Sequence, residues 1–411
     1  MYDFCPQGHF IAIQTAKINK NVILCKKIIQ KKFVKSLFVF TFAIDEYNGI
    51  MDTAKLTKII IKGYKSISSA SPITLDLNGI DVLLGANGAG KSNIISFFQM
   101  LVNMMKGGFQ KYVAESGSNK FFLHYGAKQT SEINAELWFG NLKYSFSLAN
   151  AVNERLIITN EEIATGNRNA KRLVSDFQES ALSNCESAEA KKIKNYLLNC
   201  KVYQFHDSSV TSAMRQRSET ETAHYLQSDA GNLASFLFFL QHNYQNSYNR
   251  IVDYVKSVIP QFRDFYLEPA KNLVSLNWTD TSLNDYVLSP YQFSDGSIRF
   301  IALAALLLQP AETMPTLVII DEPELGLHPY AVGQLVEMVK DASTHTQIIL
   351  ATQSPELING FDIENISVIE RDEDKQCTIV KRLNGSDYSE WLEDYTIGEL
   401  WNKNVLGGRP L

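Results

Sequence analysis

The sequence predicts an α/β fold built around a central sheet. Three apolar runs have the pattern of buried strands, at residues 82–84, 316–320 and 347–352. Helical patterns follow the first two, over residues 93–98 and from Pro329 onward. With 411 residues, 45% of them hydrophobic, the chain can bury one large core or two moderate ones.

A glycine-rich segment lies between the first strand and its helix. It reads Gly85-Ala86-Asn87-Gly88-Ala89-Gly90-Lys91-Ser92, which fits the pattern G-x-x-x-x-G-K-S. Its glycines let successive backbone N–H groups face phosphate oxygens, and the following helix adds the positive end of its dipole. Lys91 is expected to reach the β- and γ-phosphates, and the Ser92 hydroxyl to ligate Mg²⁺. A chance glycine turn is the alternative, but the strand–loop–helix setting predicts a nucleoside triphosphate site.

Two adjacent carboxylates end the second strand, at Asp321-Glu322-Pro323. A carboxylate at the tip of a buried parallel strand lies beside such a loop, so Asp321 is expected to hold Mg²⁺ through water. Glu322 is placed to polarise the attacking water as a general base. The alternative is that both are solvated turn residues, but beside a phosphate-binding loop (P-loop) the pair favours a hydrolase.

Composition limits the class of protein. No run of about 18 apolar residues occurs, so the sequence predicts no membrane span. Cysteines at positions 5, 25, 185, 200 and 377 lack metal-ligand or redox spacing, which predicts a reducing, cytoplasmic setting. The net charge is −5, so any contact with nucleic acid must use a local patch.

The segment 293–299, Phe-Ser-Asp-Gly-Ser-Ile-Arg, precedes an apolar helix pattern. Ser294 has the position of a helix N-cap, which by itself would explain the serine. The segment also resembles the signature motif of ABC-type ATPases, with Ser-Asp-Gly-Ser where Ser-Gly-Gly-Gln is commonest. This resemblance implies that Ser294 and the amides near Gly296 contact the γ-phosphate of a nucleotide held by a second subunit.

Further segments match the same class in order. Residues 325–329, Leu-Gly-Leu-His-Pro, resemble its D-loop, and His328 is expected to be structural. The third strand leads into Gln353, which has the position of the switch histidine of this class. The alternative is that Gln353 only ends the strand and has no catalytic role. Gln204 lies within a candidate strand at residues 202–205; it is either the Mg²⁺-sensing glutamine or a plain strand residue.

The opening and closing segments resemble the RecF/SMC-like branch of ABC ATPases. The similarity is to its small stand-alone members, which are often named AAA family ATPases. Gly63-Tyr64-Lys65-Ser66 is similar to the G-F-K-S stretch of SMC-type heads, and Asn87 and Asn93 fit that branch's form of the P-loop. The tail at residues 401–410 is similar to that of the stand-alone members. The resemblance implies an ABC-type ATPase head with antiparallel N-terminal strands, a mixed central sheet and an inserted helical and β lobe.

The resemblance also implies a function. It predicts an ATP- and Mg²⁺-dependent switch enzyme that closes as a head-to-tail homodimer or higher homo-oligomer and acts in DNA repair, recombination or antiphage defence. A weakly hydrolysing scaffold that holds a separate effector, such as a nuclease, is the alternative. A transporter ATPase suits the altered signature badly.

The predicted domains are an N-terminal extension at 1–51 and an ATPase head at 52–411, with the inserted lobe at about 107–292. The first 50 residues carry seven Lys and three acids, which predicts either a start-site artefact or a genuine basic arm. Within the lobe we expect a hairpin around Gly140-Asn141 and a solvated loop from residue 160 that leads to a helix near Ala188. Arg215 and Arg217 are either solvated surface or a contact for DNA.

Overall fold

The structure is a computed structural model that describes residues 55–166, 170–173, 177–282 and 286–408. The predicted N-terminal extension, 1–51, lies outside the described residues. Within the described part of the chain, no helix is both long and apolar enough to cross a membrane.

A six-stranded sheet forms the centre of the fold, in the order β17-β16-β3-β15-β14-β8. Its members are β3 (Ile80–Leu84), β8 (Cys200–Tyr203), β14 (Leu317–Asp321), β15 (Gln347–Thr352), β16 (Ile366–Asp372) and β17 (Cys377–Arg382). All neighbours run parallel except the terminal hairpin of β16 and β17. Every residue of β14 and β15 is buried, as a sheet covered on both faces requires. The predicted α/β class and mixed sheet are confirmed.

A second, antiparallel sheet lies over one face of the first. Its order is β2-β1-β4-β5-β6-β7, formed by β1 (Leu56–Lys62), β2 (Ile73–Asp76), β4 (Glu132–Phe139), β5 (Leu142–Ala151), β6 (Arg155–Thr165) and β7 (Lys171–Arg172). Helix α2 (Lys91–Met105) packs between the two sheets, with Phe97 stacked on Phe146 of β5 and Ile319 of β14 in the same cluster. The helix ends before Gly107, as its glycines predict.

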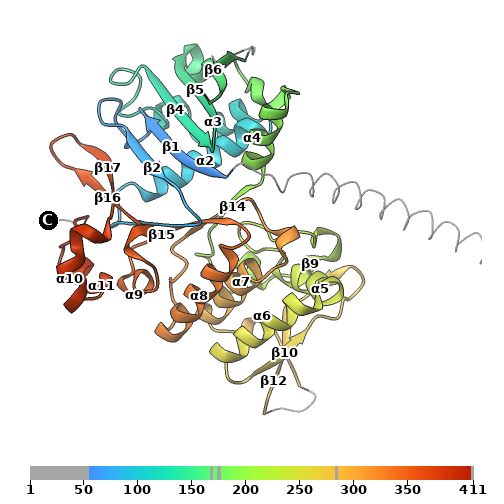
Figure 1. The fold of residues 1–411 in the computed structure, drawn as a ribbon. Coiled ribbons are helices and arrows are strands. Elements are labelled where there is room, and N and C mark those ends of the chain that lie inside the picture. Colours follow the sequence, from blue (N-terminus) through green and yellow to red (C-terminus); the bar gives the residue numbers. More distant parts are fainter. Residues whose placement is uncertain (1–54, 167–169, 174–176, 283–285, 409–411) are drawn as a thin grey trace, which may run out of the picture. The chain divides into compact units, whose positions relative to one another are not determined.

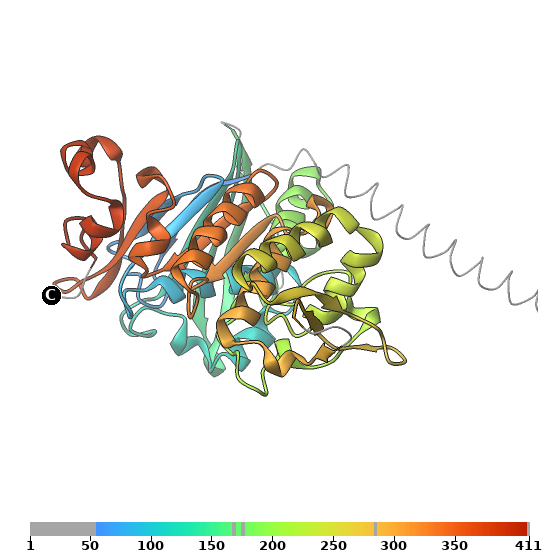
Figure 2. The same ribbon diagram turned by 90° about the horizontal axis from the view of Figure 1, so that it is seen from below.

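Other helices cover the opposite face of the central sheet. They are α7 (Asp295–Leu307) and α8 (Pro329–Ala342), backed by α5 (Leu233–Asn243) and α6 (Gln245–Val258). Along β14, Val318 and Ile320 belong to this helical core while Ile319 faces α2, because successive side chains of a strand point to opposite faces. Helices α2 and α7 therefore lie on opposite sides of the sheet (Figures 1 and 2).

The segment 107–292, where an inserted lobe is predicted, contributes to several parts of the structure. Strands β4 to β6 complete the cover over α2, and β8 forms one edge of the central sheet. Its later part holds α5, α6 and a small sheet of β10 (Phe262–Tyr266), β12 (Asn277–Asp280) and β13 (Val287–Leu288). The hairpin of β4 and β5 turns at Gly140-Asn141, as predicted.

The prediction of a solvated loop from residue 160 is wrong, because β6 continues to Thr165. This polar part of β6 contains a buried carboxylate. Glu161 is only 2% exposed and accepts hydrogen bonds from Tyr144, Ser180 and the Ala181 amide. A carboxylate with these partners can be buried at little cost, which a composition argument cannot anticipate. The predicted helix is present as α4 (Ala188–Leu198), capped by Ser187.

The C-terminal elements pack beside the hairpin of β16 and β17. Helix α9 (Pro355–Ile358) precedes the hairpin, and α10 (Ser389–Asp394) and α11 (Ile397–Asn402) follow it. Leu400 and Trp401 of α11 join the core that α7 and α8 form. The remaining short elements are α3 (Phe109–Glu115), β9 (Ser218–Glu219), β11 (Leu273–Val274) and the 3-10 turns. Of the turns, Ala213–Arg215 bears on the site.

Candidate functional site

The P-loop connects β3 to α2 in a conformation that requires glycine. Gly88 and Gly90 have φ values of +81° and +118°, in the region that residues with a Cβ avoid. A Cβ on Gly90 would lie 2.2 Å from Thr378 Oγ1, and one on Gly85 would lie 2.4 Å from the Ile369 carbonyl oxygen. The P-loop therefore packs directly against residues of β16 and β17.

The P-loop residues differ in exposure. Asn87, Gly88 and Ser92 are exposed, Ala86 is half-buried, and Ala89 is buried. Ser92 lies in the first turn of α2. Asn93 donates to Ser66 Oγ at 2.7 Å, so in this chain it also fixes the 63–66 segment against the loop.

Lys91 is buried, and its ammonium lies in the mouth of the P-loop. Its Nζ donates to the carbonyls of Gly85 at 2.6 Å and of Ala86 at 3.1 Å. Burial lowers the pKa of Lys91, while the nearby carboxylates, led by Glu322, act in the opposite direction. The fold thus supplies the negative surroundings that keep a buried cation at this position.

Asp321 ends β14 where Gln204 follows the neighbouring strand β8. Ile320 is paired with Tyr203, so the next residue of each strand meets the other. Gln204 Nε2 donates to Asp321 Oδ2 at 3.3 Å, and a ring nitrogen of His206 lies 3.1 Å from the Asp321 carbonyl oxygen. Burial raises the pKa of Asp321, and Glu322 raises it further, while His206 opposes both. The structure brings the predicted Mg²⁺ residues Gln204 and Asp321 together.

Glu322 has a backbone conformation that sets it apart from the strand. Its φ is +45°, uncommon for a residue with a side chain, and its amide donates to the Ala351 carbonyl at 2.8 Å. Gln353 Nε2 lies 3.4 Å from Glu322 Oε1. The predicted base and the residue at the switch position are therefore neighbours, and both are accessible from outside.

Glu324, two residues after Glu322, is a further acid near this pair that the sequence did not predict as a site residue. Thr352 donates to one of its oxygens, and its other carboxylate oxygen is buried without a partner among the described residues. Burial raises the pKa of Glu324. A third acid two residues after Glu322 was the available signal. With Asp321 and Glu322, Glu324 makes three acids within four residues at this edge of the sheet.

Ser294 caps α7, as predicted. Its Oγ accepts from the Ser297 amide at 3.1 Å and lies 2.7 Å from Ser297 Oγ. Gly296, in the first turn, packs against the D-loop, since a Cβ there would lie 2.4 Å from the Gly326 carbonyl oxygen. His328 in turn caps α8, accepting from the Tyr330 amide at 3.2 Å.

Arg299, on the same helix, joins this motif to two other loops. Its guanidinium donates to the carbonyls of Phe205 and His206, which follow Gln204, and to Leu325 of the D-loop. The start of α7, the D-loop and the segment after Gln204 therefore form one connected unit. The sequence offered no pattern that would have assigned this arginine.

Arg215 contradicts the prediction of solvated surface, because it is only 4% exposed. Its donors are taken up by protein acceptors on the segments around Ser208 and residues 290–295. A pair of basic residues in a polar stretch gives no sign of which one turns inward. Arg217, two residues on, is exposed.

The fold can now be compared with known structures. An SMC head bound to the C-winged helix domain of ScpA superposes with a TM-score of 0.56 at 14% identity, covering 82% of this chain and 99% of that one. The chain has the fold of an SMC-type ATPase head. Two further similar structures are an Smc head with an extended coiled coil bound to the C-terminal domain of ScpA, derived from Pyrococcus furiosus, and the SMC head of Thermotoga maritima. Their TM-scores are 0.49 and 0.40, at 12% and 14% identity, covering 83% and 80% of this chain and 99% of each of those.

Sequence comparison covers less of the chain. A family model described as "AAA domain, putative AbiEii toxin, Type IV TA system" matches residues 211–359, which hold the signature segment and the acidic pair. None of the curated proteins matches the chain. In this fold the predicted P-loop follows β3, Asp321 ends β14 and α7 packs on the same sheet, so the three segments share one framework.

The close approach of Gly296 to the D-loop gives a test of this framework. Gly296→Ala forces a Cβ against a backbone carbonyl, so we expect the free energy of unfolding to fall by about 1–3 kcal/mol. Gly333→Ala is the matched control, because nothing lies within 4 Å of its Cβ and it sits on an exposed position of α8. That control should gain about 0.5–1 kcal/mol, as measured by denaturant unfolding. Equal stability of the two variants would show that the D-loop can withdraw freely.

Proposed function

We propose that this protein is an ATPase that works as a switch, with two copies closing head to tail around two nucleotides. The observation that carries the proposal is the position of Ser294. Its helix α7 lies on the opposite face of the central sheet from α2, which begins with Lys91. A serine capping α7 is thus poorly placed for the P-loop of its own chain, and a second copy would supply it.

The phosphates are assigned to the P-loop and Lys91. The conformation of Gly88 and Gly90 leaves the loop free of Cβ atoms where phosphate oxygens would approach, and the Lys91 ammonium would offset their charge. The donor set of Ser92, Asp321 and Gln204 consists of oxygens, which suits Mg²⁺. When bound, Mg²⁺ would neutralise charge on the phosphates.

Hydrolysis is assigned to Glu322 and Gln353. Glu322 would accept the proton of the attacking water, and Gln353, which already lies beside it, would orient that water or the γ-phosphate by hydrogen bonding. Because an amide stays neutral, Gln353 cannot share the charge that a histidine would. This departure favours slow turnover.

The exposed surface near the signature supports an assembly. Three large side chains in or next to the signature and D-loop segments are exposed: Tyr291 at 52%, Leu325 at 42% and Tyr330 at 54%. Large apolar groups gathered beside a functional motif mark interaction surfaces. In the proposed dimer they would face the partner's P-loop.

The biological setting is proposed from the comparisons. The matching family model is described by a putative toxin of a Type IV toxin–antitoxin system, and the similar structures are SMC heads, two of them bound to ScpA. We therefore propose a cytoplasmic role in DNA repair, recombination or antiphage defence, with DNA or a separate effector such as a nuclease as partner. The second candidate, a scaffold that binds ATP and hydrolyses it poorly, is favoured by Gln353.

Mixing two inactive variants tests the head-to-tail site. A Lys91→Ala chain still presents Ser294, and a Ser294→Ala chain still presents Lys91. In an equal mixture half of the dimers would be mixed, each with one complete site, so we expect about a quarter of the wild-type ATP turnover. Turnover is measured after two-colour pull-down has established subunit exchange.

The outcomes of this experiment separate the proposals. Proven exchange without a gain in turnover would reject the shared site and leave Ser294 as a helix cap. A gain that needs added DNA favours the repair or defence enzyme, because the ligand must then bias assembly. Nucleotide-dependent dimers with negligible turnover in every mixture favour the scaffold.

A further inference from the structure

Arg215 lies inside the loop that leads into the signature helix. Its Nη1 donates to the Pro290 carbonyl at 2.6 Å and to the Phe293 carbonyl at 3.1 Å. Its Nη2 pairs with Asp295 Oδ1 at 2.9 Å, and its Nε donates to the Ser208 carbonyl at 3.0 Å. Two of its acceptor residues, Phe293 and Asp295, are the immediate neighbours of Ser294 in the sequence.

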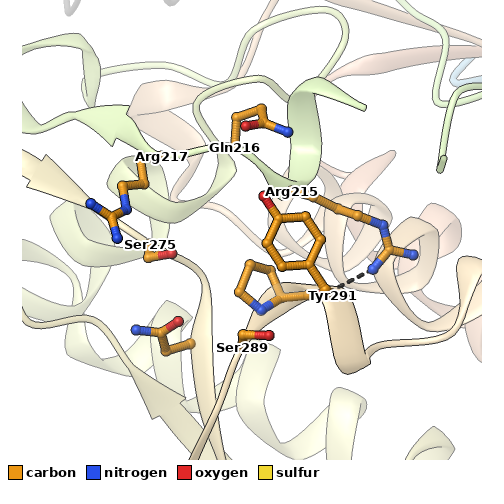
Figure 3. Close-up of a pocket in the computed structure, with 8 residues that line it drawn as sticks. Arg215, Gln216, Arg217, Ser275, Ser289 and Tyr291 are labelled. Carbon is orange, nitrogen blue, oxygen red and sulfur yellow. Dashed lines mark hydrogen bonds between the residues drawn. The ribbon is translucent and has the colours of Figure 1, made fainter. Parts of the chain in front are cut away.

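The loop that Arg215 binds has open space on one side. A cavity of about 390 Å³ lies beside it, lined by Arg215, Gln216, Arg217, Ser275, Asn277, Ser289, Pro290 and Tyr291. Figure 3 shows Arg217 and Ser275 across this space from Tyr291, while the Arg215 side chain runs behind the tyrosine. The other side of the segment is packed, with Pro290 buried and Phe293 stacked on Trp278, so the hydrogen bonds from Arg215 add support on the cavity side.

Charge explains the unusual residue in the signature. An arginine stays ionised at any depth, so its burial requires acceptors and a compensating charge. Three carbonyls supply the acceptors, and Asp295 is the carboxylate that pairs with it. Asp295 stands where glycine is commonest in signature motifs of the resembling class. The aspartate that departs from the common motif and the buried arginine therefore form an ion pair.

We propose that Arg215 is the positioning residue for Ser294, holding the signature segment in the place where it would meet the partner's nucleotide. This inference rests on the proposed head-to-tail ATPase. In this proposal Arg215 supports the signature segment that acts on the nucleotide of the partner chain, even though Arg215 itself lies in the segment that follows Gln204. Its hydrogen bonds in the described part of the chain go to Ser208, Pro290, Phe293 and Asp295 and not to the P-loop, so we expect nucleotide binding within its own chain to be independent of it.

The substitution that tests this is Arg215→Met, which keeps the aliphatic stem and removes the guanidinium. Hydrogen bonds from a charged donor are worth enough for a loss of about 10- to 100-fold in ATP turnover, with ATP affinity of the isolated chain within about twofold. Arg215→Lys should recover only part of the loss, because one ammonium cannot span two carbonyls and a carboxylate. Arg250→Met is the control: Arg250 pairs with Asp341 at 2.8 Å, but both side chains are about half exposed. It should keep wild-type turnover.

Complementation then assigns the site on which Arg215 acts. Mixed with Lys91→Ala, the Arg215→Met chain offers an intact P-loop to an intact signature, so turnover should rise to about a quarter of wild type. Mixed with Ser294→Ala it should show no rise, since both chains then lack a working signature. A rise with Ser294→Ala alone would overturn the proposal by placing Arg215 at its own nucleotide. No rise with either partner, while the Lys91→Ala and Ser294→Ala mixture is active, would also overturn it.

A second readout does not depend on the dimer. Hydrogen exchange of the amides at 293–298, measured on nucleotide-free protein, should become at least about tenfold faster in Arg215→Met than in Arg250→Met, with the central sheet unchanged. Unchanged exchange would overturn the proposal even if the head-to-tail site exists. Faster exchange together with an inactive Lys91→Ala and Ser294→Ala mixture would keep the local role of Arg215 and reject only the shared site.

Discussion

Lys91→Ala is expected to abolish MgATP binding, with an affinity at least about 100-fold weaker than that of the wild type. The ammonium lies in the mouth of the P-loop on the carbonyls of Gly85 and Ala86, where the phosphates would approach. Its removal leaves the protein without a side-chain cation at the P-loop to offset the phosphate charge. Equilibrium titration with a fluorescent ATP analogue measures the effect.

A surface lysine provides the control for this substitution. Lys111 pairs with Glu115 one helical turn away, and its side chain is 78% exposed, so Lys111→Ala should bind ATP within about twofold of wild type. The temperature of unfolding without nucleotide checks that both variants fold. Near-normal affinity in Lys91→Ala would reject the assignment of this loop to phosphate.

Glu322→Gln is expected to keep ATP binding and to lower turnover by about 10²–10⁴-fold, because an amide can position water but cannot accept its proton. The amide has the shape of the carboxyl group it replaces, so the backbone at φ +45° is equally tolerated. Trapped ATP should then prolong the closed dimer, which size-exclusion chromatography with MgATP would detect.

The neighbouring acid offers an isosteric comparison. Glu324 accepts a hydrogen bond from Thr352 and its other carboxylate oxygen is buried, so Glu324→Gln should reduce turnover much less than Glu322→Gln. Turnover above about a tenth of wild type in Glu322→Gln would give that residue another role. A larger loss in Glu324→Gln would move the general base to Glu324.

Local patterns were sufficient for the elements that meet at the site. Gly85 to Ser92 between a strand and a helix, the β-branched run before Asp321 and the cap at Ser294 each depend on residues close in sequence, so they could be predicted. The hairpin around Gly140-Asn141 has the same origin. The loop predicted from residue 160 was wrong because Glu161 is made compatible with burial by partners that lie far along the chain.

The sequence by itself determined the fold class, the P-loop and the candidate residues at the strand ends, because turn chemistry and hydrophobic periodicity act over a few residues. Only the tertiary structure decided which of these meet. Gln204 lies beside Asp321 because of the register of β8 and β14. Ser294 and Lys91 lie on opposite faces of the central sheet because α7 packs on one face and α2 on the other. The burial of Arg215 was decided at the same level: its acceptors lie 7 to 80 positions away in sequence, and no local pattern records a contact that exists only after the chain has folded.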